Sequence, residues 1–390
     1  MSAADWVVLV AFSLVLYHWV LYPALVHLFA TFTRRKPIAG MERPPTVSVL
    51  IPAYNEEVAI AAKIRNCLRL DYPEDQLEVL VGSDASSDQT DAIVNSLDSA
   101  RVRLVRLPRR SGYPSVMNRL AATAKGELLL CTDADILLDS GALRHLAAAF
   151  SDPNVGVACA RYERVGRHGH HAENFYDRYE SWIKNSESRL GLMVGAYGAG
   201  IMLRKHTWMD IPRDTILGDL WVGTTALARG LRVVQVQAAK AAGSTEDPAG
   251  EFSRKARIGR GSVQAFVRRP KPYMPWSGLQ GWAVFSHKGL RMLFPWLLLA
   301  MFMGSAVGAI NSVHDRVLLA VQLGFWLTSP LPLLPSLRPL KGLLAIQYLM
   351  LMAVALGLGA VQHVLRRGRV APERTPRAAG PDAVRRDSIL

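Results

Sequence analysis

Cysteine is scarce in this 390-residue chain, and the three cysteines, Cys67, Cys131 and Cys159, do not have the spacing of a metal site. Each lies within an apolar periodic segment, so we expect free, buried thiols in a reducing compartment. The sequence also has no G-x-G-x-x-G fingerprint and no Walker lysine motif, which argues against a dinucleotide-binding fold and against a P-loop. No internal repeat is evident.

Charge is nearly absent between Asp5 and Phe32, and this segment is long enough to cross a bilayer as a helix. It is followed by Arg34, Arg35 and Lys36. A signal peptide would carry its positive charge before the apolar run, and here the order is reversed. We therefore predict a membrane anchor over residues 1–36. Because basic residues stay on the cytoplasmic side, its N-terminus should lie outside and the next segment in the cytoplasm.

The chain becomes apolar again after Ser286. Three candidate spans follow, at residues 293–310, 317–334 and 343–365. The middle one is the weakest, because it is short and prolines interrupt its end. We predict a bundle of two or three spans over residues 292–366 and a basic, disordered tail over residues 367–390. Three spans would place this tail outside, against the positive-inside tendency, so the number and parity of the spans stay open.

Residues 271–291 are a candidate for an amphipathic helix in the membrane interface. Its apolar side would hold Trp276, Trp282, Phe285 and Leu290, with His287, Lys288 and Arg291 near the headgroups. The formal net charge of +14 suits work against an anionic membrane face and phosphate-bearing ligands. Nucleic acid is the competing partner, but the spans and the lack of a basic stripe interleaved with aromatics argue against it. We expect a multi-pass protein of the cell membrane (inner or plasma membrane), with membrane lipids as partners and a cytoplasmic middle part.

Short apolar runs alternate with helical patterns from Pro44 to about Gln264, as in an α/β sheet with crossover helices. The predicted strands are residues 46–54, 77–84, 102–108, 126–135 and 155–162. The predicted helices are residues 55–70, 87–97, 113–124 and 140–150, with Asn55 as the N-cap of the first. The strands are almost continuously apolar, as expected when helices cover both faces of a sheet. We predict one α/β domain over residues 44–270.

Polar residues follow four of these strands. They form the segments 52–56, 83–88, 109–112 and 132–135. Ligands of open α/β sheets bind outside the carboxyl ends of the strands, so this edge is the predicted binding site.

Asp133 and Asp135 are the most informative residues of that edge. Residues i and i+2 of an extended chain point to the same side, and two like charges there need a cation or a hydrogen-bond network. Mg²⁺ or Mn²⁺ meets this need, often with one or two carboxylates and with substrate phosphates in the remaining positions. A solvated turn after the strand is the alternative interpretation of the triplet taken alone.

In their order and spacing, the segments SVLIPAYNEE, SDASSD, RSGYPSVMN and TDAD resemble glycosyltransferase family 2. This family has the GT-A fold and includes cellulose, chitin and hyaluronan synthases. The resemblance covers residues 46–264. It implies a Rossmann-like nucleotide-diphospho-sugar transferase domain, which transfers a sugar to an acceptor hydroxyl with inversion at the anomeric carbon.

The resemblance implies roles for the residues at the sheet edge. Those that would bind the nucleotide or donor are Pro52, Tyr54, Glu56 (or Glu57), Asp84, Arg110, Gly112 and Asp133. Asp84 would accept a hydrogen bond from uracil, which favours a UDP-sugar, although Ser83 stands where many relatives have another aspartate. Asp135 would bind the metal that bridges the two phosphates. Tyr197 and Gly198 would contact the donor sugar and the acceptor end.

Asp219 matches the second acid of a pair that precedes a helix in the family and deprotonates the acceptor hydroxyl. Gly218 replaces the first acid. An inverting transfer needs one general base, so a single carboxylate suffices, but the replacement leaves acceptor positioning open. As an alternative, Asp219 could cap the helix that follows.

The stretch RKARI lines up with the QxxRW signature of the family, with Arg254, Arg257 and Ile258 at its three named positions. Arg257 would then clamp the leaving diphosphate by paired hydrogen bonds. Loss of the tryptophan weakens the expectation of long-chain processivity. A solvated basic helix face is the alternative.

These patterns predict a membrane-anchored, metal-dependent, inverting glycosyltransferase of the hexosyltransferase type, which uses a nucleotide-sugar donor. The acceptor would be a polysaccharide or glycan at the cytoplasmic membrane face. A lipid acceptor, either polyprenyl phosphate or a glycolipid, explains the spans equally well and fits the missing tryptophan. The second alternative is a catalytically silent, nucleotide-sugar-binding subunit with a membrane partner, against which the acids Asp84, Asp135 and Asp219 argue.

Overall fold

The computed structural model describes residues 2–33, 43–165, 175–195, 199–244, 248–333 and 341–365. The chain forms two compact units. The first, here called the helical unit, comprises Met1–Leu28 and Asp247–Arg369, and the second, the sheet unit, lies within Phe29–Glu246. The predicted tail and the basic residues 34–36 lie outside the described residues.

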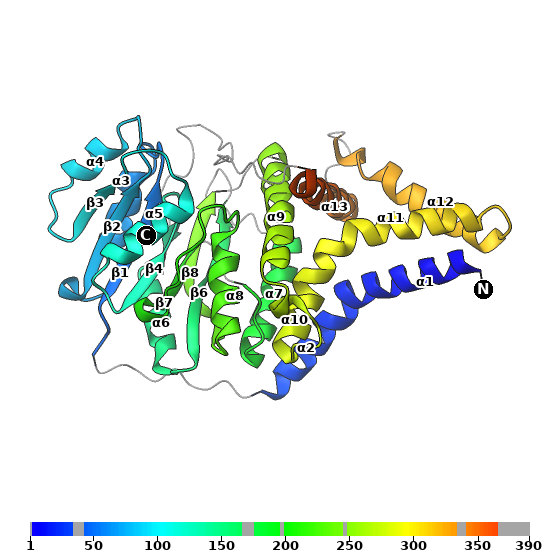
Figure 1. The fold of residues 1–390 in the computed structure, drawn as a ribbon, viewed down its shortest axis with the longest axis horizontal. Coiled ribbons are helices and arrows are strands. Elements are labelled where there is room, and N and C mark those ends of the chain that lie inside the picture. The colour runs from blue at the N-terminus through cyan, green and yellow to red at the C-terminus, as the bar shows by residue number, and fades with distance from the viewer. Residues whose placement is uncertain are drawn as a thin grey trace. The chain divides into compact units, whose positions relative to one another are not determined.

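The sheet unit is built on an eight-stranded mixed sheet (Figure 1). Its strands are β1 (Val47–Ala53), β2 (Leu77–Ser83), β3 (Val102–Arg106), β4 (Leu128–Cys131), β5 (Leu137–Leu138), β6 (Val155–Val165), β7 (Ile201–Arg204) and β8 (Arg232–Ser244). They lie in the order β3-β2-β1-β4-β7-β6-β8-β5. β1 is parallel to β2 and β4, and β2 to β3, whereas β7 is antiparallel to both its neighbours.

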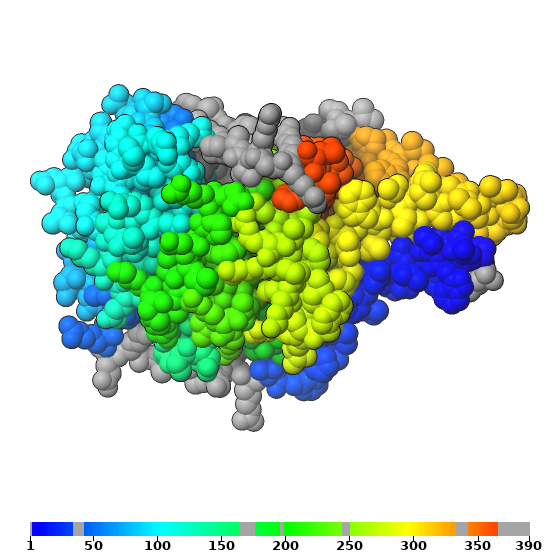
Figure 2. All heavy atoms as spheres, viewed as in Figure 1, coloured from blue at the N-terminus to red at the C-terminus, as the bar shows by residue number. Residues whose placement is uncertain are grey.

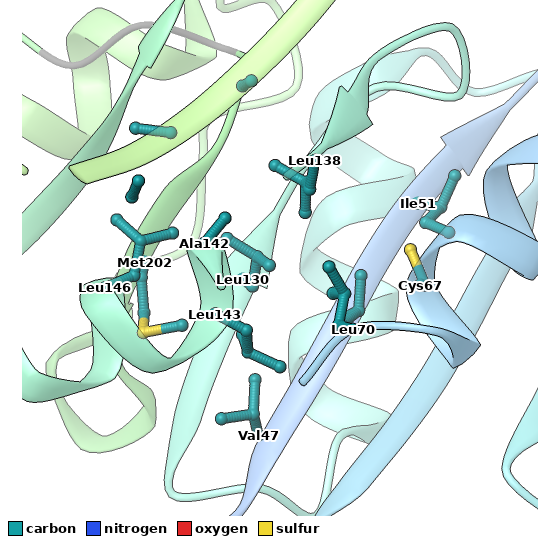
Figure 3. Packing of buried hydrophobic residues seen from close by; sticks show 14 of the residues in the cluster. Val47, Ile51, Cys67, Leu70, Leu130, Leu138, Ala142, Leu143, Leu146 and Met202 are labelled. Atoms are coloured by element: carbon teal, nitrogen blue, oxygen red, sulfur yellow. The ribbon is translucent and has the colours of Figure 1, made fainter. Parts of the chain in front are cut away.

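Helices cover both faces of this sheet. They are α3 (Ile60–Leu68), α4 (Thr90–Ser96), α5 (Tyr113–Thr123), α6 (Ala142–Ala148), α7 (Phe175–Leu190) and α8 (Gly218–Ala228). Alternate side chains of β1, such as Ile51, pack in one core with α3, α4 and α6. Figure 3 shows Ile51 beside Cys67 of α3, with Leu143 and Leu146 of α6 near Met202. On the other face, Val116 and Leu120 of α5 close over Gly82 of β2. The predicted α/β class is confirmed.

The first predicted helix begins later than expected, at Ile60, and the N-cap prediction for Asn55 is wrong. Asn55 has a φ of +54°, a left-handed conformation that asparagine tolerates better than most residues. Its Oδ1 atom accepts a hydrogen bond from the Ser87 N–H at 2.9 Å. Asn55 therefore ties the loop after β1 to the loop after β2 and does not cap a helix.

The helical unit contains α1 (Ala3–Leu16), α9 (Pro248–Arg268), α10 (Leu279–Val284), α11 (Leu290–Gly308), α12 (Val313–Thr328) and α13 (Lys341–Leu365). A π-helical turn at Tyr17–Leu21 continues α1 into α2 (Tyr22–Phe32), and another at Phe285–Gly289 joins α10 to α11. Among the described residues, three helices are long and apolar enough to cross a membrane: Ala3–Phe32, Leu279–Gly308 and Gly342–Leu365. α12, at 16 residues, is shorter than these.

Two boundaries differ from the predicted ones. Residues 279–291 of the candidate interfacial helix form the first part of the helix that ends at Gly308. α9, which was expected to close the α/β domain, is grouped with the helical unit and packs on α13. This packing is close, because Gly259 of α9 lies against the Leu356 carbonyl and Gly359 of α13 against the Ala256 carbonyl.

Candidate active site

Side-chain hydrogen bonds join the loops that follow β1, β2 and β3. Glu56 N–H donates to Thr90 Oγ1 at 2.8 Å, next to the contact between Asn55 and Ser87. Asp84 accepts hydrogen bonds from the loop after β3. The structure thus brings together five of the residues predicted to bind the nucleotide, namely Tyr54, Glu56, Asp84, Arg110 and Gly112.

Asp84 is buried, and both its carboxylate oxygens are used within the protein. Oδ1 accepts from Ser111 N–H at 2.6 Å and Oδ2 from Gly112 N–H at 2.9 Å. Hydrogen bonds from backbone amides to a charged carboxylate are strong, so Asp84 fixes this loop. Each carboxylate oxygen of Asp84 has a further lone pair that can accept a hydrogen bond. The contact of Asp84 with the nucleotide base stays a prediction.

Arg110 and Tyr54 form a flat, polar surface at the same edge. The guanidinium carbon of Arg110 lies 4.1 Å from the centroid of the Tyr54 ring, a cation–π contact. Arg110 is exposed and Tyr54 half-buried. A planar cation in such a place suits a phosphate or a base.

Asp133 and Asp135 lie on the turn that follows β4. Both are partly exposed, whereas Ala134 and Ile136 are buried at 2% and 7% exposure. This alternation turns the two carboxylates to one side and the apolar side chains to the other, as the sequence predicts.

Lys63 and Asn66 of α3 form hydrogen bonds with this turn and with the strand that follows it. Neither residue was predicted from the sequence. Lys63 is wholly buried, and its Nζ donates to Thr132 Oγ1 at 2.9 Å and to the Ile136 carbonyl at 2.6 Å. The Asn66 amide accepts from Leu138 N–H and donates to its carbonyl. Thr132 Oγ1 in turn contacts the Ala199 carbonyl at 3.1 Å.

Burial lowers the pKa of Lys63, and the neighbouring charges of Cys67, Asp133 and Asp135 act in the opposite direction. The Asp-x-Asp turn thus has a buried amine beneath it, whose charged form is disfavoured by burial and favoured by the two aspartates. A signal for this was present, because Lys63 falls in the apolar stripe of its helix with Ile60, Ile64 and Cys67. A lysine on a buried face requires partners.

Asp219 lies in the first turn of α8, where a negative charge is favourable. Its Oδ1 accepts from the N–H of Leu220 at 2.8 Å. The N-cap of α8 is Leu217, so Asp219 binds a first-turn N–H group but is not the cap that the alternative interpretation expected. The side chain is partly exposed. It therefore has an open side from which it can take a proton.

The two predicted acidic centres approach one stretch of sheet. Cys131 of β4 and Cys159 of β6 both pair with Ile201 of β7, which puts the two thiols about 10 Å apart at ordinary strand spacing. Burial, and then the charge of Asp133, raises the pKa of Cys131 to about 12. Burial raises the pKa of Cys159 to about 12, with Lys184 lowering it and Asp219 raising it. Asp133 and Asp219 thus act on neighbouring positions of the sheet. All three cysteines are free and buried, as predicted.

The carboxylates fit a cation that is shared with a substrate. Asp133 and Asp135 offer the hard oxygen ligands that Mg²⁺ and Mn²⁺ take, and leave room for phosphate oxygens. Within the described parts of the chain, no group of three or more His, Cys, Asp or Glu residues could hold a metal ion by itself. The donor set therefore suits a metal–diphosphate complex better than an all-protein site.

Three predicted residues keep their roles as predictions only. Tyr197 and Gly198 lie outside the described residues. Arg257 lies on α9 in the helical unit, where its Nε is buried without a hydrogen-bond partner. On the same helix, Arg254 forms an ion pair with Glu251 at 2.8 Å. The diphosphate role of Arg257 stays a prediction.

A mixed α/β sheet with an Asp-x-Asp turn at its carboxyl edge is the architecture of GT-A glycosyltransferases. The family model described as "Glycosyl transferase family 2" matches residues 48–206, and that described as "Glycosyl transferase family group 2" matches residues 128–359. The chain belongs to glycosyltransferase family 2.

Curated relatives match part of the chain. Probable glycosyltransferase YdaM of Bacillus subtilis (strain 168) is 33% identical over 160 residues, 39% of this chain and 38% of that protein. Beta-monoglucosyldiacylglycerol synthase of Trichormus variabilis is 31% identical over 193 residues, 45% of this chain and 40% of that protein. The poly(ribitol-phosphate) beta-N-acetylglucosaminyltransferase TarS of Staphylococcus aureus is 29% identical over 124 residues, 31% and 22% of the two chains. The match to the first two spans about two fifths of their length.

Among solved structures, the chain is similar to the mannosyltransferase PcManGT from Pyrobaculum calidifontis in complex with GDP-Man and Mn²⁺. The TM-score is 0.70 at 22% identity, and the match covers 93% of this chain and 99% of that one. This likeness confirms the predicted GT-A fold.

Proposed function

We propose that this chain is a metal-dependent, inverting glycosyltransferase that moves a sugar from a nucleotide diphosphate donor to an acceptor hydroxyl. The observation that carries the proposal is that the Asp-x-Asp turn and Asp219 act on β4 and β6, the two strands that flank β7 in one sheet. The proposed donor is a UDP-sugar, because Asp84 would accept a hydrogen bond from uracil. PcManGT holds GDP-Man, so guanosine donors belong in any test.

In the proposed reaction, Asp219 takes the proton of the acceptor hydroxyl while that oxygen attacks the anomeric carbon. The bond from this carbon to the diphosphate oxygen breaks, and its electron pair leaves with the nucleoside diphosphate. Asp135 would hold Mg²⁺ or Mn²⁺, which would neutralise charge on the diphosphate, and Asp133 would contact the nucleotide or donor sugar. The loop fixed by Asp84, with the Arg110–Tyr54 pair, would orient the nucleotide, and Arg257 would bind the leaving diphosphate.

The proposed acceptor is a polysaccharide or glycan at the cytoplasmic face of a membrane. TarS, which is named for its activity on poly(ribitol-phosphate), supports this class. A lipid acceptor is the second candidate, and two observations favour it. Ile258 stands in place of the signature tryptophan, and the Trichormus relative is named as a synthase of a glucosylated diacylglycerol. The three apolar helices suit either acceptor in a multi-pass membrane protein.

The test is release of nucleoside diphosphate by the purified full-length chain from UDP-glucose, UDP-N-acetylglucosamine and GDP-mannose, with Mn²⁺ or with EDTA. We expect Mn²⁺-dependent release from one of them, and Asp219→Asn should abolish it. Asp210→Asn, at an exposed aspartate nearby in sequence, is the matched control and should behave as wild type. A chain that binds these nucleotides but releases no diphosphate would instead be the silent subunit.

Labelled product separates the two acceptors. After incubation of membranes with the active donor, radiolabel extracted into organic solvent indicates a lipid acceptor. Label that stays with the insoluble polymer indicates a polysaccharide.

A further inference from the structure

The structure gives a steric reason for the glycine at position 218, directly before the proposed base Asp219. A Cβ atom at Gly218 would lie 2.5 Å from Cε1 and 3.2 Å from Cδ1 of Tyr113. Non-bonded carbon atoms prefer about 3.5–4.0 Å, so any side chain at this position collides with the ring. The Tyr113 ring thus occupies the space in which the first acid of the family's pair would begin.

Tyr113 itself is placed by the predicted nucleotide loop. It is the first residue of α5 and follows Gly112, whose φ of +84° favours glycine. The Asp84 carboxylate binds the N–H groups of Ser111 and Gly112 just ahead of the ring. Any nucleotide held by this loop therefore lies close to Tyr113.

The same helix also fixes the segment that leads to Asp219. The Asn118 side chain accepts from Ile211 N–H and donates to its carbonyl, both at 2.9 Å. α5 thus contacts this segment at two points, Ile211 and Gly218. Figure 2 shows the cyan surface that includes α5 beside the green surface that includes α8. The ring of Tyr113 lies between the nucleotide loop and the base.

The donor sugar of a nucleotide sugar must lie in that interval, because it connects the diphosphate to the acceptor oxygen at the base. Tyr113 is 37% exposed, so part of its ring is open to a ligand. Sugar rings present apolar C–H faces, and ligand sites use aromatic side chains as walls beside a few polar groups.

We propose that Tyr113 contacts the donor sugar beside Asp219, and that Gly218 is required because only glycine leaves room for this ring. The inference rests on the proposed function. The Tyr113 ring then fills the space of the missing acid and positions the donor sugar beside the base.

The test uses the purified full-length chain and whichever of UDP-glucose, UDP-N-acetylglucosamine and GDP-mannose the wild type turns over. The variants are Tyr113→Ala, Tyr113→Phe, Gly218→Ala and the double variant Tyr113→Ala/Gly218→Ala. For each, KM and kcat for the donor are measured together with the affinity for the free nucleoside diphosphate, UDP or GDP.

Tyr113→Ala should lower kcat/KM for the donor by about tenfold, the scale of a lost aromatic contact, with unchanged affinity for the free nucleoside diphosphate. Tyr113→Phe keeps the ring and should behave as wild type. Gly218→Ala displaces the ring and should share the defect of Tyr113→Ala. The double variant should be no worse than Tyr113→Ala, because the colliding ring is gone.

Parallel loss of donor and free-diphosphate affinity in Tyr113→Ala would overturn the inference, as would a Gly218→Ala variant with wild-type kinetics. If the wild type turns over a donor and Tyr113→Ala has the same kinetics, the sugar contact is refuted while the proposed function stands. A wild type that releases diphosphate from none of the three refutes the proposed function and the inference with it.

Discussion

Replacing Lys63 by methionine removes the one group that joins α3 to both sides of the Asp-x-Asp turn. In the native chain its Nζ donates to Thr132 Oγ1 and to the Ile136 carbonyl, in a fully buried position. Methionine has a similar length and fills the space, so little cavity is created. The change therefore isolates the loss of the amine and its hydrogen bonds.

The expected cost follows from those contacts. A buried polar group left without its partner costs about 1–3 kcal/mol, and two acceptors lose their donor here. Relief of the burial of the lysine charge offsets part of this, so we expect a loss of about 3 kcal/mol of unfolding free energy. For a unit of about 200 residues that corresponds to a melting temperature lower by about 6–12 °C.

The assay is thermal unfolding of the purified chain followed by tryptophan fluorescence, together with the Mn²⁺ concentration that gives half-maximal diphosphate release. We expect this concentration to rise at least threefold, because the turn that carries Asp133 and Asp135 loosens. The control is Lys125→Met, at an exposed lysine, which should change neither quantity. An unchanged melting temperature with tighter Mn²⁺ binding would refute the reasoning, since it would leave only the electrostatic effect of Lys63.

Two further predictions concern packing and pH. Gly259→Ala should destabilise the helical unit by about 1–3 kcal/mol, because its Cβ would meet the Leu356 carbonyl oxygen at 2.5 Å. Gly342→Ala, with open space around it, should be neutral or slightly stabilising in the same melting experiment, and equal effects of the two would contradict the close packing. Asp88 is partly buried, which raises its pKa, but hydrogen bonds from Thr90 and from Glu57 N–H lower it to a net value below that of a free aspartate. Asp88→Asn should therefore cost about 1 kcal/mol at pH 7, because an amide keeps one acceptor oxygen and cannot accept both the Thr90 and the Glu57 N–H hydrogen bonds. The wild-type advantage is fully present above the ordinary aspartate pKa of about 3.9 and should fade as the pH falls through the lower folded value; an advantage that grows as the pH falls below 3.9 would contradict this.

Much of the sheet could be predicted because its strands are apolar on both faces. β1 and β4 are buried almost throughout, and their boundaries fall where polar residues begin. The Asp-x-Asp turn was predictable for the same reason, since two carboxylates directly after a buried strand stand out from any background.

The rest depends on contacts that no local pattern reveals. Lys63 and Asn66 are polar side chains in a helix, and only the tertiary structure shows that they are buried against residues 132–138. From the sequence, Gly218 was interpreted only as the loss of an acid. The ring that packs against it belongs to Tyr113, more than 100 residues earlier in the chain, and no local pattern predicts this contact. The grouping of α9 with the helical unit was missed because its charges resemble those of a surface helix of the α/β domain.

The most direct test of the proposed chemistry compares Asp219→Asn and Asp135→Asn in the full-length chain. UDP or GDP binding, with and without Mn²⁺, and diphosphate release from the active donor are measured for both. Asp219→Asn should lose turnover by about 10²-fold or more, as removal of a general base does, while it keeps Mn²⁺-dependent nucleotide binding. Asp135→Asn should lose the Mn²⁺-dependent part of binding as well as turnover. Near-wild-type turnover in Asp219→Asn, or an equal loss of binding in both variants, would contradict the division of roles between the two acids.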